Sequence, residues 1–484
     1  MGTSNHERLG TDPFSEQPVN PDPRIIAIAR AVRTIGGRVL IVGGWVRDRV
    51  LGIPSKDIDI EVHGVTMDEL EHVLSGFGEV IPMGRQFGVL QVKGLHADFA
   101  LPRLDRRVGA GHRGFEIQTD PSSGYPRSAR RRDLTINSMG FDPLTEELLD
   151  PYDGRRDLAS GILRATDAAT FGEDPLRALR VAQFAARFSM TPEASLVSLC
   201  SALDLSELAA ERIFEEFHKL LVRGVEPSRG FAFLRACGLI RFFPEIAALI
   251  GVPQDPTWHP EGDVWTHTLM VVDEAARLRQ DEPADVPLMF AALCHDLGKP
   301  ATTECRDGRI RSPSHAPRGV PPTRALLRRW RAPKRLIAQV SAMVEHHLAP
   351  ATFPEQGAKP RAYRRLARRL ATAGVSMQQL ERLSRADHLG RTTPEALSRQ
   401  FAAGDRFLEE VRKLDLETAP PQDAVQGHHL VARGFQSGPE LGRLLTRCRA
   451  LQDETGWTDP QRILDKVLHD LDSGHGGPRW RDER

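Results

Sequence analysis

The chain has 484 residues, of which 40% are hydrophobic and 27% are charged. These proportions are ordinary for a soluble globular protein and exclude a mostly disordered chain. Lysine plus arginine and aspartate plus glutamate each number 65, so the formal net charge is zero. A uniformly basic nucleic-acid coat is therefore excluded, although a basic face balanced by acidic regions elsewhere is compatible with these numbers.

The spacing of the cysteines and the lengths of the apolar segments indicate the cellular compartment of the protein. The five cysteines are scattered and form no Cys-x-x-Cys pair, which argues against a disulfide scaffold or a zinc ribbon and favours a reducing cytoplasm. No apolar run is long enough to span a bilayer, and the first residues lack the apolar stretch of a secretory signal. We therefore expect a cytoplasmic protein with no membrane contact. At about 150 residues per domain, the length predicts roughly three domains.

The first half begins with a polar segment and then alternates helices and strands. Residues 1–22 are predicted to form a disordered tail. Hydrophobic periodicity then predicts, in chain order, a helix over 25–35, a strand over 38–42, a helix over 45–51 and strands over 58–62, 89–92 and 97–101. Gly43 and Gly44 directly follow the first strand, so a tight turn is expected there.

That turn and the next strand carry the first candidate site. Glycines at a strand-to-helix turn let backbone N–H groups approach phosphate oxygens, and Arg47 could add a charge-assisted contact. Asp57 and Asp59 are two apart on a predicted strand, so both carboxylates point to one face. Like charges at that spacing repel, and a hard divalent cation offsets the repulsion. Two such ions would activate an attacking hydroxyl and stabilise a leaving pyrophosphate. Asp98 is a candidate third carboxylate, with a structural role as the alternative.

A series of motifs carries a family resemblance. The run VGGWVRDRVLGIPSKDIDIEVHG resembles the head of the class II tRNA nucleotidyltransferases and bacterial poly(A) polymerases. Later segments continue the resemblance in the same order. Residues 103–115 resemble that family's flexible loop beside the active site, 131–137 its RRD motif and 150–154 its head-to-neck hinge. Residues 173–180 resemble its nucleotide-recognition helix, and 211–217 resemble the helix that buttresses it. The resemblance implies that two catalytic aspartates, Asp57 and Asp59, hold Mg²⁺. It also implies that Gly44, Arg47 and Arg132 bind the triphosphate.

The recognition segment has a physical interpretation of its own. Asp174 and Arg177, three residues apart, would share a helix face and offer hydrogen-bond acceptors beside a rigid donor fork. Such a pair suits the Watson–Crick edge of cytosine or adenine, so side chains could choose the base without a template. Arg180, one turn further on, could reach the triphosphate. The alternative is that Asp174 only caps a helix that begins at Pro175.

The second half is predicted to be helical and to carry a second candidate site. Helical periodicity dominates from 158 to 243 and, after a proline-rich link over 252–256, again to about 414. Histidines and aspartates recur on these predicted helices, which is a common way to hold a divalent metal. A bound cation would lower the pKa of a coordinated water and supply hydroxide for phosphoester hydrolysis. For any single histidine, an imidazole without a metal is the alternative.

Residues 258–299 resemble the HD phosphohydrolase domain, which is appended to some bacterial class II CCA-adding enzymes. The resemblance implies four core metal ligands and two residues near a second ion: His267, His295, Asp296 and Asp387, and His315 and His347. Ser314 stands where the family usually has a glycine. We prefer His347 over His346 because His347 continues the apolar face of its helix. The expected metal is a divalent transition ion such as Ni²⁺ or Mn²⁺, or Mg²⁺.

The predicted fold class is α+β, with a small nucleotidyltransferase head containing a mixed β-sheet, an all-α neck and body, an all-α HD domain and a helical tail. The expected boundaries are a disordered tail over 1–22, the head over 23–150, the neck and body with the recognition helix over 151–250, the HD domain over 251–415, the RNA-binding tail over 416–475 and a disordered end over 476–484.

The resemblance implies template-independent addition or repair of the 3′-terminal CCA of tRNA from CTP and ATP. It also implies a metal-dependent phosphohydrolase acting on 2′,3′-cyclic phosphates or 2′-nucleotides. The tRNA acceptor stem is the expected partner, and the oligomeric state is left open. A poly(A) polymerase or an A-adding enzyme, which would share the head motifs, is the first alternative. A hydrolase whose head only binds RNA is the second, and a purely structural HD region is the third.

Overall fold

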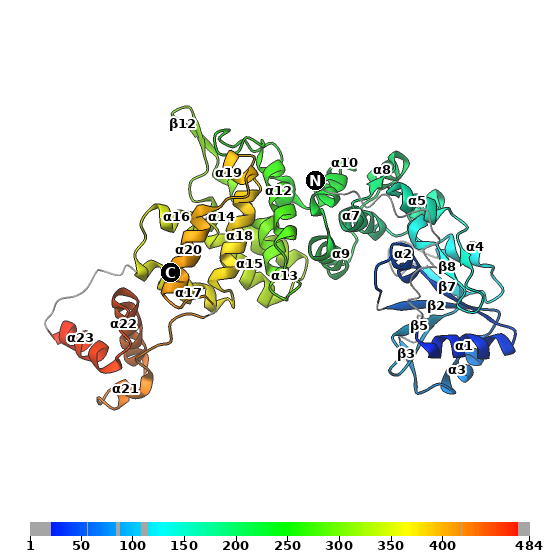
Figure 1. The fold of residues 1–484 in the computed structure, drawn as a ribbon, viewed down its shortest axis with the longest axis horizontal. Coiled ribbons are helices and arrows are strands. Elements are labelled where there is room, and N and C mark those ends of the chain that lie inside the picture. Colours follow the sequence, from blue (N-terminus) through cyan, green and yellow to red (C-terminus); the bar gives the residue numbers. More distant parts are fainter. Residues whose placement is uncertain (1–20, 56, 84–87, 108–114, 418, 473–484) are drawn as a thin grey trace. The chain divides into compact units, whose positions relative to one another are not determined.

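The computed structural model describes residues 21–472 apart from 56, 84–87, 108–114 and 418 (Figure 1). The chain divides after Phe242 into two compact units. None of the helices in these ranges has the length and apolar character that a membrane span requires. All five cysteines are free thiols, and four of them are buried, in keeping with the absence of a predicted disulfide framework.

The first unit is built on a seven-stranded mixed sheet with the order β3-β4-β5-β2-β1-β8-β9. The strands are β1 (Arg38–Val42), β2 (Ile58–His63), β3 (Val80–Met83), β4 (Val89–Val92), β5 (Ala97–Ala100), β8 (Gly140–Phe141) and β9 (Leu148–Leu149). β2 pairs in parallel with β5, and the other neighbours are antiparallel. The last four residues of β1 are buried, because this apolar strand has a neighbour on each side and helices against it.

Local sequence signals set the ends of the helices around the sheet. α1 (Pro23–Thr34) begins after Asp22, whose side chain accepts a hydrogen bond from the Arg24 N–H. Asp22 is thus part of the folded structure, although it was included in the predicted disordered tail over 1–22. α3 (Met67–Ser75) begins with a capping box formed by Thr66 and Glu69. α1 and α3 pack against each other, and α2 (Gly44–Val50) packs against β1 and β2.

Part of the predicted flexible loop over 103–115 forms a hairpin. β6 (Arg103–Arg107) pairs antiparallel with β7 (Phe115–Thr119). Residues 108–114 of that loop lie outside the described residues, as do the predicted disordered end over 476–484 and most of the predicted tail over 1–22.

The remainder of the first unit is mainly helical. Its elements are α4 (Tyr125–Ala129), η2 (Thr135–Asn137), α5 (Gly154–Ser160), β10 (Ile162–Leu163), α6 (Ala168–Phe171), α7 (Leu176–Phe188), β11 (Thr191–Pro192), α8 (Ala194–Ser201), α9 (Ala210–Arg223), α10 (Pro227–Ala236) and η3 (Leu239–Phe242). α7 packs against both α9 and α10. The buried rings of Phe217 and Phe231 stack with centroids 5.9 Å apart and link α9 to α10.

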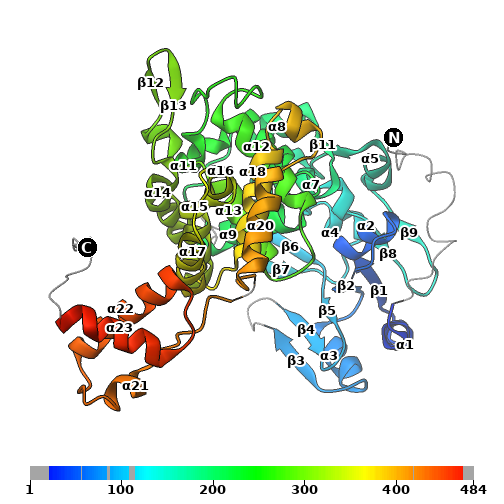
Figure 2. The same cartoon turned by 60° about the vertical axis from the view of Figure 1, so that its left-hand side comes forward.

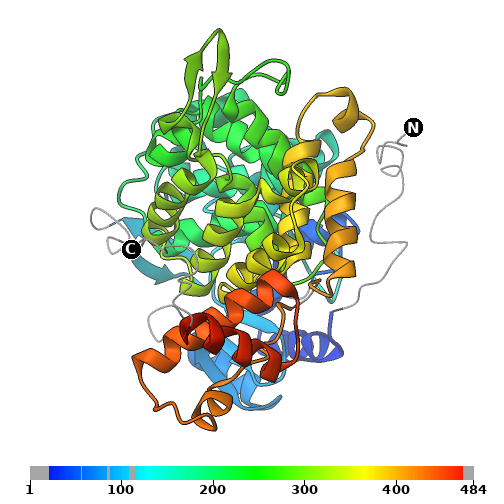
Figure 3. The same ribbon diagram turned by 90° about the vertical axis from the view of Figure 1, so that its left-hand side faces the viewer.

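The second unit is a helical bundle with one small hairpin (Figures 2 and 3). Its elements are α11 (Pro244–Ala247), α12 (Val264–Arg277), α13 (Asp285–Cys294), η4 (Lys299–Ala301), β12 (Glu304–Arg306), β13 (Arg309–Arg311), α14 (His315–Arg329), α15 (Lys334–His346), α16 (Ala349–Glu355), α17 (Pro360–Thr372), α18 (Met377–Leu389), α19 (Pro394–Leu397), α20 (Ala402–Lys413), α21 (Gly427–Val431), α22 (Pro439–Thr455) and α23 (Pro460–Asp472). α13 is apolar on nearly all sides, and it is buried against α12, α15 and α18.

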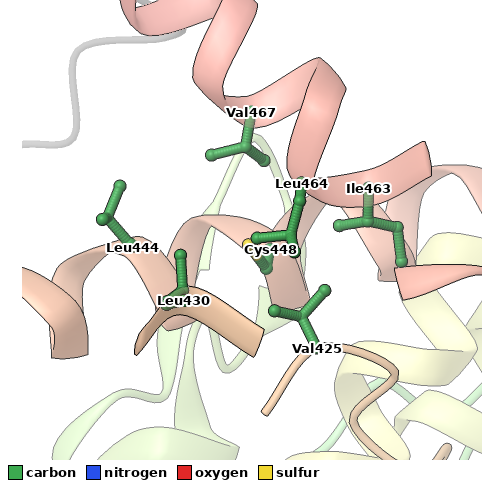
Figure 4. Close-up of a cluster of buried hydrophobic side chains, with 7 residues drawn as sticks. All are labelled: Val425, Leu430, Leu444, Cys448, Ile463, Leu464 and Val467. Carbon is green, nitrogen blue, oxygen red and sulfur yellow. The ribbon is translucent and has the colours of Figure 1, made fainter. Parts of the chain in front are cut away.

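The three C-terminal helices have a small core of their own. Figure 4 shows seven side chains gathered between α21, α22 and α23: Val425, Leu430, Leu444, Cys448, Ile463, Leu464 and Val467. α22 packs against α17 largely through charged groups. Arg368 contacts Asp453 and Asp423 at 2.9 and 2.5 Å, and Arg361 contacts Glu454 at 2.7 Å. These arginines of the basic run 361–369 are therefore engaged within the protein.

The predicted fold class is confirmed by the mixed sheet and the helical remainder. Two details differ, because the pairs β10–β11 and β12–β13 interrupt regions that were predicted to be entirely helical. Both pairs are two or three residues long, which is too short to leave a period-2 signal in the sequence. The division after Phe242 lies close to the predicted boundary at 250, and the other predicted boundaries stay predictions.

Candidate active sites

The glycine turn lies beside the acidic pair. Gly43 directly follows β1 and has a φ of 73°, a backbone conformation that favours glycine. A Cβ added to Gly43 would stand 2.9 Å from Arg132 Nη1 and 3.5 Å from Asp59 Oδ2. The preceding residue, Val42, pairs with Asp59 across the β1–β2 ladder. The turn, a guanidinium and a carboxylate thus meet at one corner of the sheet.

Carboxylates crowd this corner. Asp57 directly precedes β2, and Asp59 lies on β2 opposite Asp98 of β5. Asp59 is exposed, yet the surrounding protein removes part of its hydration and raises its pKa. Arg132 opposes this shift, while the carboxylates of Asp98 and Asp57 add to it. A set of oxygen donors that repel one another suits a hard divalent cation.

The third carboxylate has a local partner. Asp98 Oδ1 accepts a hydrogen bond from Gln91 Nε2 at 2.5 Å. Among the described residues, Asp57, Asp59 and Asp98 do not form a group whose ligand atoms all lie within 4.8 Å of one another. The roles of Asp57 and Asp59 as metal ligands, and of Asp98 as a third, therefore stay predictions.

A pocket of about 460 Å³ adjoins the acidic corner. Its lining includes Asp59 and all six residues that the sequence predicted to bind the nucleotide: Gly44, Arg47, Arg132, Asp174, Arg177 and Arg180. The structure thus brings together residues that lie up to 136 positions apart in the sequence.

Arg47 is held in place by buried partners. Its Nε and Nη2 donate to Asp48 Oδ1 at 2.9 and 2.6 Å, and its Nη1 donates to Asn137 Oδ1 at 2.6 Å. Its guanidinium carbon also lies 5.0 and 4.9 Å from the ring centroids of Phe184 and Phe188. Each of its three nitrogens is already engaged, so direct binding of phosphate by Arg47 stays a prediction.

Asp133, to which the sequence motif assigned no role, orients Arg180. Its Oδ2 accepts from Arg180 Nε at 2.6 Å, and its Oδ1 accepts from the Leu134 N–H and from Asn137 Nδ2 at 2.8 and 2.9 Å. Burial opposes the ionisation of Asp133, but Arg180 and these hydrogen bonds lower its pKa to about 2. Arg180 is thereby fixed at the wall of the pocket.

Glu61 is a second residue to which the sequence motifs assigned no role. It lies on β2, two positions after Asp59, and it is buried. Its carboxylate lies 3.0 Å from His63 Nε2 and 3.8 Å from Arg132 Nη2. Burial opposes its ionisation, but the contacts with His63 and Arg132 lower its pKa to about 2. The period of β2 could have shown that Glu61 shares a face with the acidic pair.

Asp174 stands before the recognition helix and not on it. α7 begins at Leu176, and Asp174 Oδ1 accepts a hydrogen bond from the Leu176 N–H at 3.1 Å. Asp174 therefore lies before the helix, outside the helix face on which the sequence placed it, but it lines the same pocket as Arg177, so their joint role in base selection stays a prediction. The other oxygen accepts from Arg212 Nη2 at 2.9 Å. Arg177 donates to two backbone carbonyls nearby.

We expect Asp133→Asn to lower the free energy of unfolding by about 2 kcal/mol at pH 7, since each pKa unit corresponds to about 1.4 kcal/mol. The carboxyl titrates at 3.8 in its ordinary state and at about 2 in the folded chain. The stabilisation is therefore present above pH 4 and lost as the pH falls toward 2. Chemical denaturation at pH 7 and pH 3 should show the difference between variant and wild type shrinking by about 1 kcal/mol. An equal difference at both values would contradict this assignment.

The second site is a cluster of histidines in the helical bundle. Three of the histidines donate from Nδ1 to the carbonyl three residues before: His295 to Ala292 at 2.9 Å, His315 to Ser312 at 2.9 Å and His347 to Val344 at 2.8 Å. A carbonyl can only accept, so Nδ1 carries the proton and Nε2 is left to bind a metal. His267 Nδ1 faces Glu261 at 2.8 Å, and its Nε2 faces Asp387 at 3.1 Å.

Asp296 lies between two groups of these histidines. Its Oδ2 is 3.2 Å from His295 Nε2 and 3.9 Å from His267 Nε2, whereas its Oδ1 is 3.5 Å from His315 Nε2. His267, His295 and Asp296 form one group with ligand atoms within 4.8 Å, and Asp296, His315 and His347 form another. The four predicted histidine ligands thus surround the carboxylate of Asp296. The sixth predicted residue, Asp387, lies next to His267.

The donor set fits divalent metal ions. Asp296 Oδ1 and the Nε2 atoms of His295 and His347 are buried without a hydrogen-bond partner among the described residues. Asp296 Oδ2 is also buried, and it pairs with Lys299 Nζ at 2.7 Å. Burial lowers the pKa of His347 to about 3, so its imidazole is neutral and able to bind a metal at pH 7. For His295, burial works in the same direction, but Asp296 more than offsets it and raises the pKa. Buried, unsatisfied nitrogen and oxygen donors of this kind are what a metal would satisfy.

Gly298 lets the second group form. A Cβ at this position would lie 2.0 Å from the His315 carbonyl oxygen, so only glycine allows α14 to approach so closely. Gly298 lies four residues after the last residue of α13, Cys294, and has an ordinary φ of −84°, so its role is to leave space and not to allow a left-handed backbone. Ser314 adopts a φ of 56° directly before α14, in the left-handed region where a glycine would be more usual.

Comparison with known proteins agrees with this two-site arrangement. Three family models match in order: a poly A polymerase head domain over residues 39–164, a probable RNA and SrmB-binding site of polymerase A over 190–250, and an HD domain over 264–377. A multifunctional CCA protein from Laribacter hongkongensis (strain HLHK9) is 42% identical over 301 residues, which cover 61% of this chain and 71% of that protein. The chain belongs to the multifunctional CCA protein family.

Solved structures show that the fold of this multifunctional CCA protein family member is that of CCA-adding enzymes. The Bacillus stearothermophilus CCA-adding enzyme in complex with CTP superimposes with a TM-score of 0.65 at 18% identity, covering 97% of this chain and 100% of that one. The Thermotoga maritima CCA-adding enzyme complexed with tRNA_CCA gives 0.57 at 19% identity, covering 94% and 97%.

Proposed function

We propose that this chain is a template-independent nucleotidyltransferase that adds or repairs the 3′-terminal CCA of tRNA from CTP and ATP. The observation that carries the proposal is the pocket in which Asp59 and all six predicted nucleotide-binding residues meet. Membership of the multifunctional CCA protein family supports it, and so does the fold shared with CCA-adding enzymes. The free, mostly buried cysteines suit the reducing cytoplasm that such a role requires.

Mg²⁺ is the metal that we propose for the head, with Asp57 and Asp59 as its protein ligands. When bound there, the metal would supply charge stabilisation for the attacking and leaving oxygens. The chain's own contribution is to hold the triphosphate. Arg132, positioned by Glu61, lies at the glycine turn, and Arg180, positioned by Asp133, lies at the pocket wall. Fixed guanidinium groups favour phosphate oxygens because little ordering is needed on binding.

Base selection is assigned to Asp174 and Arg177. Their hydrogen bonds with Arg212 and with backbone carbonyls hold a carboxylate and a guanidinium at the pocket wall. A carboxylate can accept from the exocyclic amine of cytosine or adenine, and a guanidinium can donate to a ring nitrogen. The acceptor stem of tRNA is the proposed RNA partner, and it would be bound by shape and phosphate contacts.

Sequencing the 3′ ends of products is the experiment that tests this proposal. A tRNA lacking its terminal CCA is incubated with the protein and with CTP, ATP or both. The proposal predicts that two cytidines followed by one adenosine are added when both nucleotides are present. Addition of a single adenosine only, or of a long adenosine run, would instead identify an A-adding enzyme or a poly(A) polymerase.

We propose a second activity, metal-dependent phosphohydrolysis, at the histidine cluster. The observation that favours it is the inward-facing set of unsatisfied imidazole and carboxylate atoms around Asp296. The proposed substrates are 2′,3′-cyclic phosphates and 2′-nucleotides, and the proposed metals are Mn²⁺, Ni²⁺ or Mg²⁺. Asp296 has an oxygen on each side, so we propose that it is shared by two ions. A metal there would supply hydroxide from bound water.

A further inference from the structure

Arg391 lies next to the metal-ligand cluster with most of its donors unused. It follows α18 and reaches back so that its Nη2 is 3.4 Å from Asp387 Oδ1. The same oxygen is already 3.1 Å from His267 Nε2. This long contact is the one side-chain hydrogen bond that Arg391 makes to a described residue, and its buried Nε has no partner there. A guanidinium carries five N–H donors, so most of its hydrogen-bonding capacity is open.

Arg385, which lies on α18, is a structural arginine with which the hydrogen bonding of Arg391 can be compared. Both side chains are 21% exposed. Arg385 donates from Nε to Glu381 at 2.9 Å and from Nη2 to Asp405 at 2.7 Å. The two arginines are thus equally buried, but the donors of Arg385 have close partners, whereas most of those of Arg391 do not. Leaving a partly buried cation unsatisfied costs free energy, and an anionic ligand would recover that cost.

A second cation lies on the Asp296 side of the cluster. Lys299 Nζ is 2.7 Å from Asp296 Oδ2 and donates to Gln254 Oε1 at 2.7 Å. Lys299 thus contacts one of the two carboxylates, and Arg391 contacts the other. Lys299 has two close partners, whereas Arg391 has a single long one. Arg391 is consequently the better placed of the two cations to turn toward a ligand.

We propose that Arg391 binds the phosphate of the substrate at the histidine cluster and orients it against the metal ligands. This inference rests on the proposed phosphohydrolase function and specifies its substrate class as a phosphoryl group with two accessible non-bridging oxygens. The planar fork of arginine matches two such oxygens, whereas lysine would supply charge without that geometry. Arg391 is thus a binding residue, distinct from the six ligand candidates.

Binding of inorganic phosphate to the metal-loaded full-length protein tests this proposal. Isothermal titration compares wild type, Arg391→Gln, Arg391→Lys and the control Arg399→Gln, whose arginine pairs with Glu274 instead. Mn²⁺ content is measured on each sample by mass spectrometry. We expect Arg391→Gln to keep its Mn²⁺ and to bind phosphate at least about tenfold more weakly, since charge-assisted hydrogen bonds contribute this much. Arg391→Lys should recover part of the loss, and Arg399→Gln should match wild type.

Three results would overturn the proposal: unchanged phosphate affinity in Arg391→Gln, loss of Mn²⁺ in that variant, or no phosphate binding by the wild type. Loss of Mn²⁺ would mean that Arg391 only supports Asp387. Failure of the proposed hydrolase function is a separate result. It would appear as wild-type protein that does not hydrolyse 2′,3′-cyclic AMP although its phosphate affinity still depends on Arg391.

Discussion

Asp59→Asn should reduce the rate of nucleotide incorporation into tRNA by about 10³-fold, and Asp57→Asn should have a comparable effect, because a metal ion at the reacting oxygens contributes several kcal/mol to the transition state. Binding of the tRNA itself should change little, since both residues lie at the acidic corner of the sheet, which adjoins the nucleotide pocket. Single-turnover incorporation of CMP from labelled CTP measures the effect. Asp68→Asn, an exposed carboxylate in the first turn of α3, is the matched control.

Asp59→Asn should also have a characteristic effect on the stability of the folded chain. The surrounding protein removes part of the hydration of Asp59, and this desolvation, together with the carboxylates of Asp98 and Asp57, raises its pKa. The ionised form is therefore disfavoured in the folded chain and costs free energy at pH 7. Removing the charge should therefore leave the thermal midpoint unchanged or raise it, while activity is lost. A variant that loses both activity and stability would indicate that Asp59 is a structural residue, and one that keeps full activity would remove it from the reaction.

The second large effect is expected at the histidine cluster. Asp296→Asn should abolish metal-dependent hydrolysis of 2′,3′-cyclic nucleotides, with a loss of about 10³-fold or more, because Asp296 is the residue that both ligand groups share. CCA addition should stay within about twofold of wild type, since no ligand of the head is altered and only the second compact unit is changed. Parallel assays of hydrolysis and nucleotide incorporation on one preparation measure both effects.

Two adjacent histidines provide a matched pair for this experiment. His347 is buried with its Nε2 unsatisfied, while His346 is half-buried and belongs to neither ligand group. His347→Gln should lose bound metal and hydrolysis, and His346→Gln should retain both. Equal behaviour of the two variants would contradict the assignment of His347 to the site.

The periodicity of single elements made part of each site predictable. A strand repeats every two residues, so the spacing of Asp57 and Asp59 predicts that both point to one face, although Asp57 directly precedes β2 in the structure. A helix repeats every 3.6 residues, which distinguished His347 from its neighbour. Motif order supplied the six nucleotide-binding candidates that line the pocket: Gly44, Arg47, Arg132, Asp174, Arg177 and Arg180. Periodicity and motif order are local signals. They were sufficient for the fold class, because the hydrophobic pattern within each element identifies the face that it buries.

Partners that meet only through tertiary packing could not be predicted. Arg212 is 38 positions from Asp174, and Arg180 is 47 positions from Asp133. No period or spacing rule links such pairs. The engagement of Arg47 by Asn137 likewise depends on how α2 packs against η2. Proline chemistry explains why Asp174 precedes its helix, and that signal was present in the sequence at Pro175.

We propose that nucleotide transfer at the head depends on a divalent metal held by the carboxylates of Asp57 and Asp59 beside the turn formed by Gly43 and Gly44. Anomalous diffraction from crystals soaked with CTP and Mn²⁺ tests this directly. We predict a manganese peak at coordination distance, about 2.1 Å, from both carboxylates and next to the triphosphate. A bound triphosphate whose manganese lies away from these two side chains would contradict it.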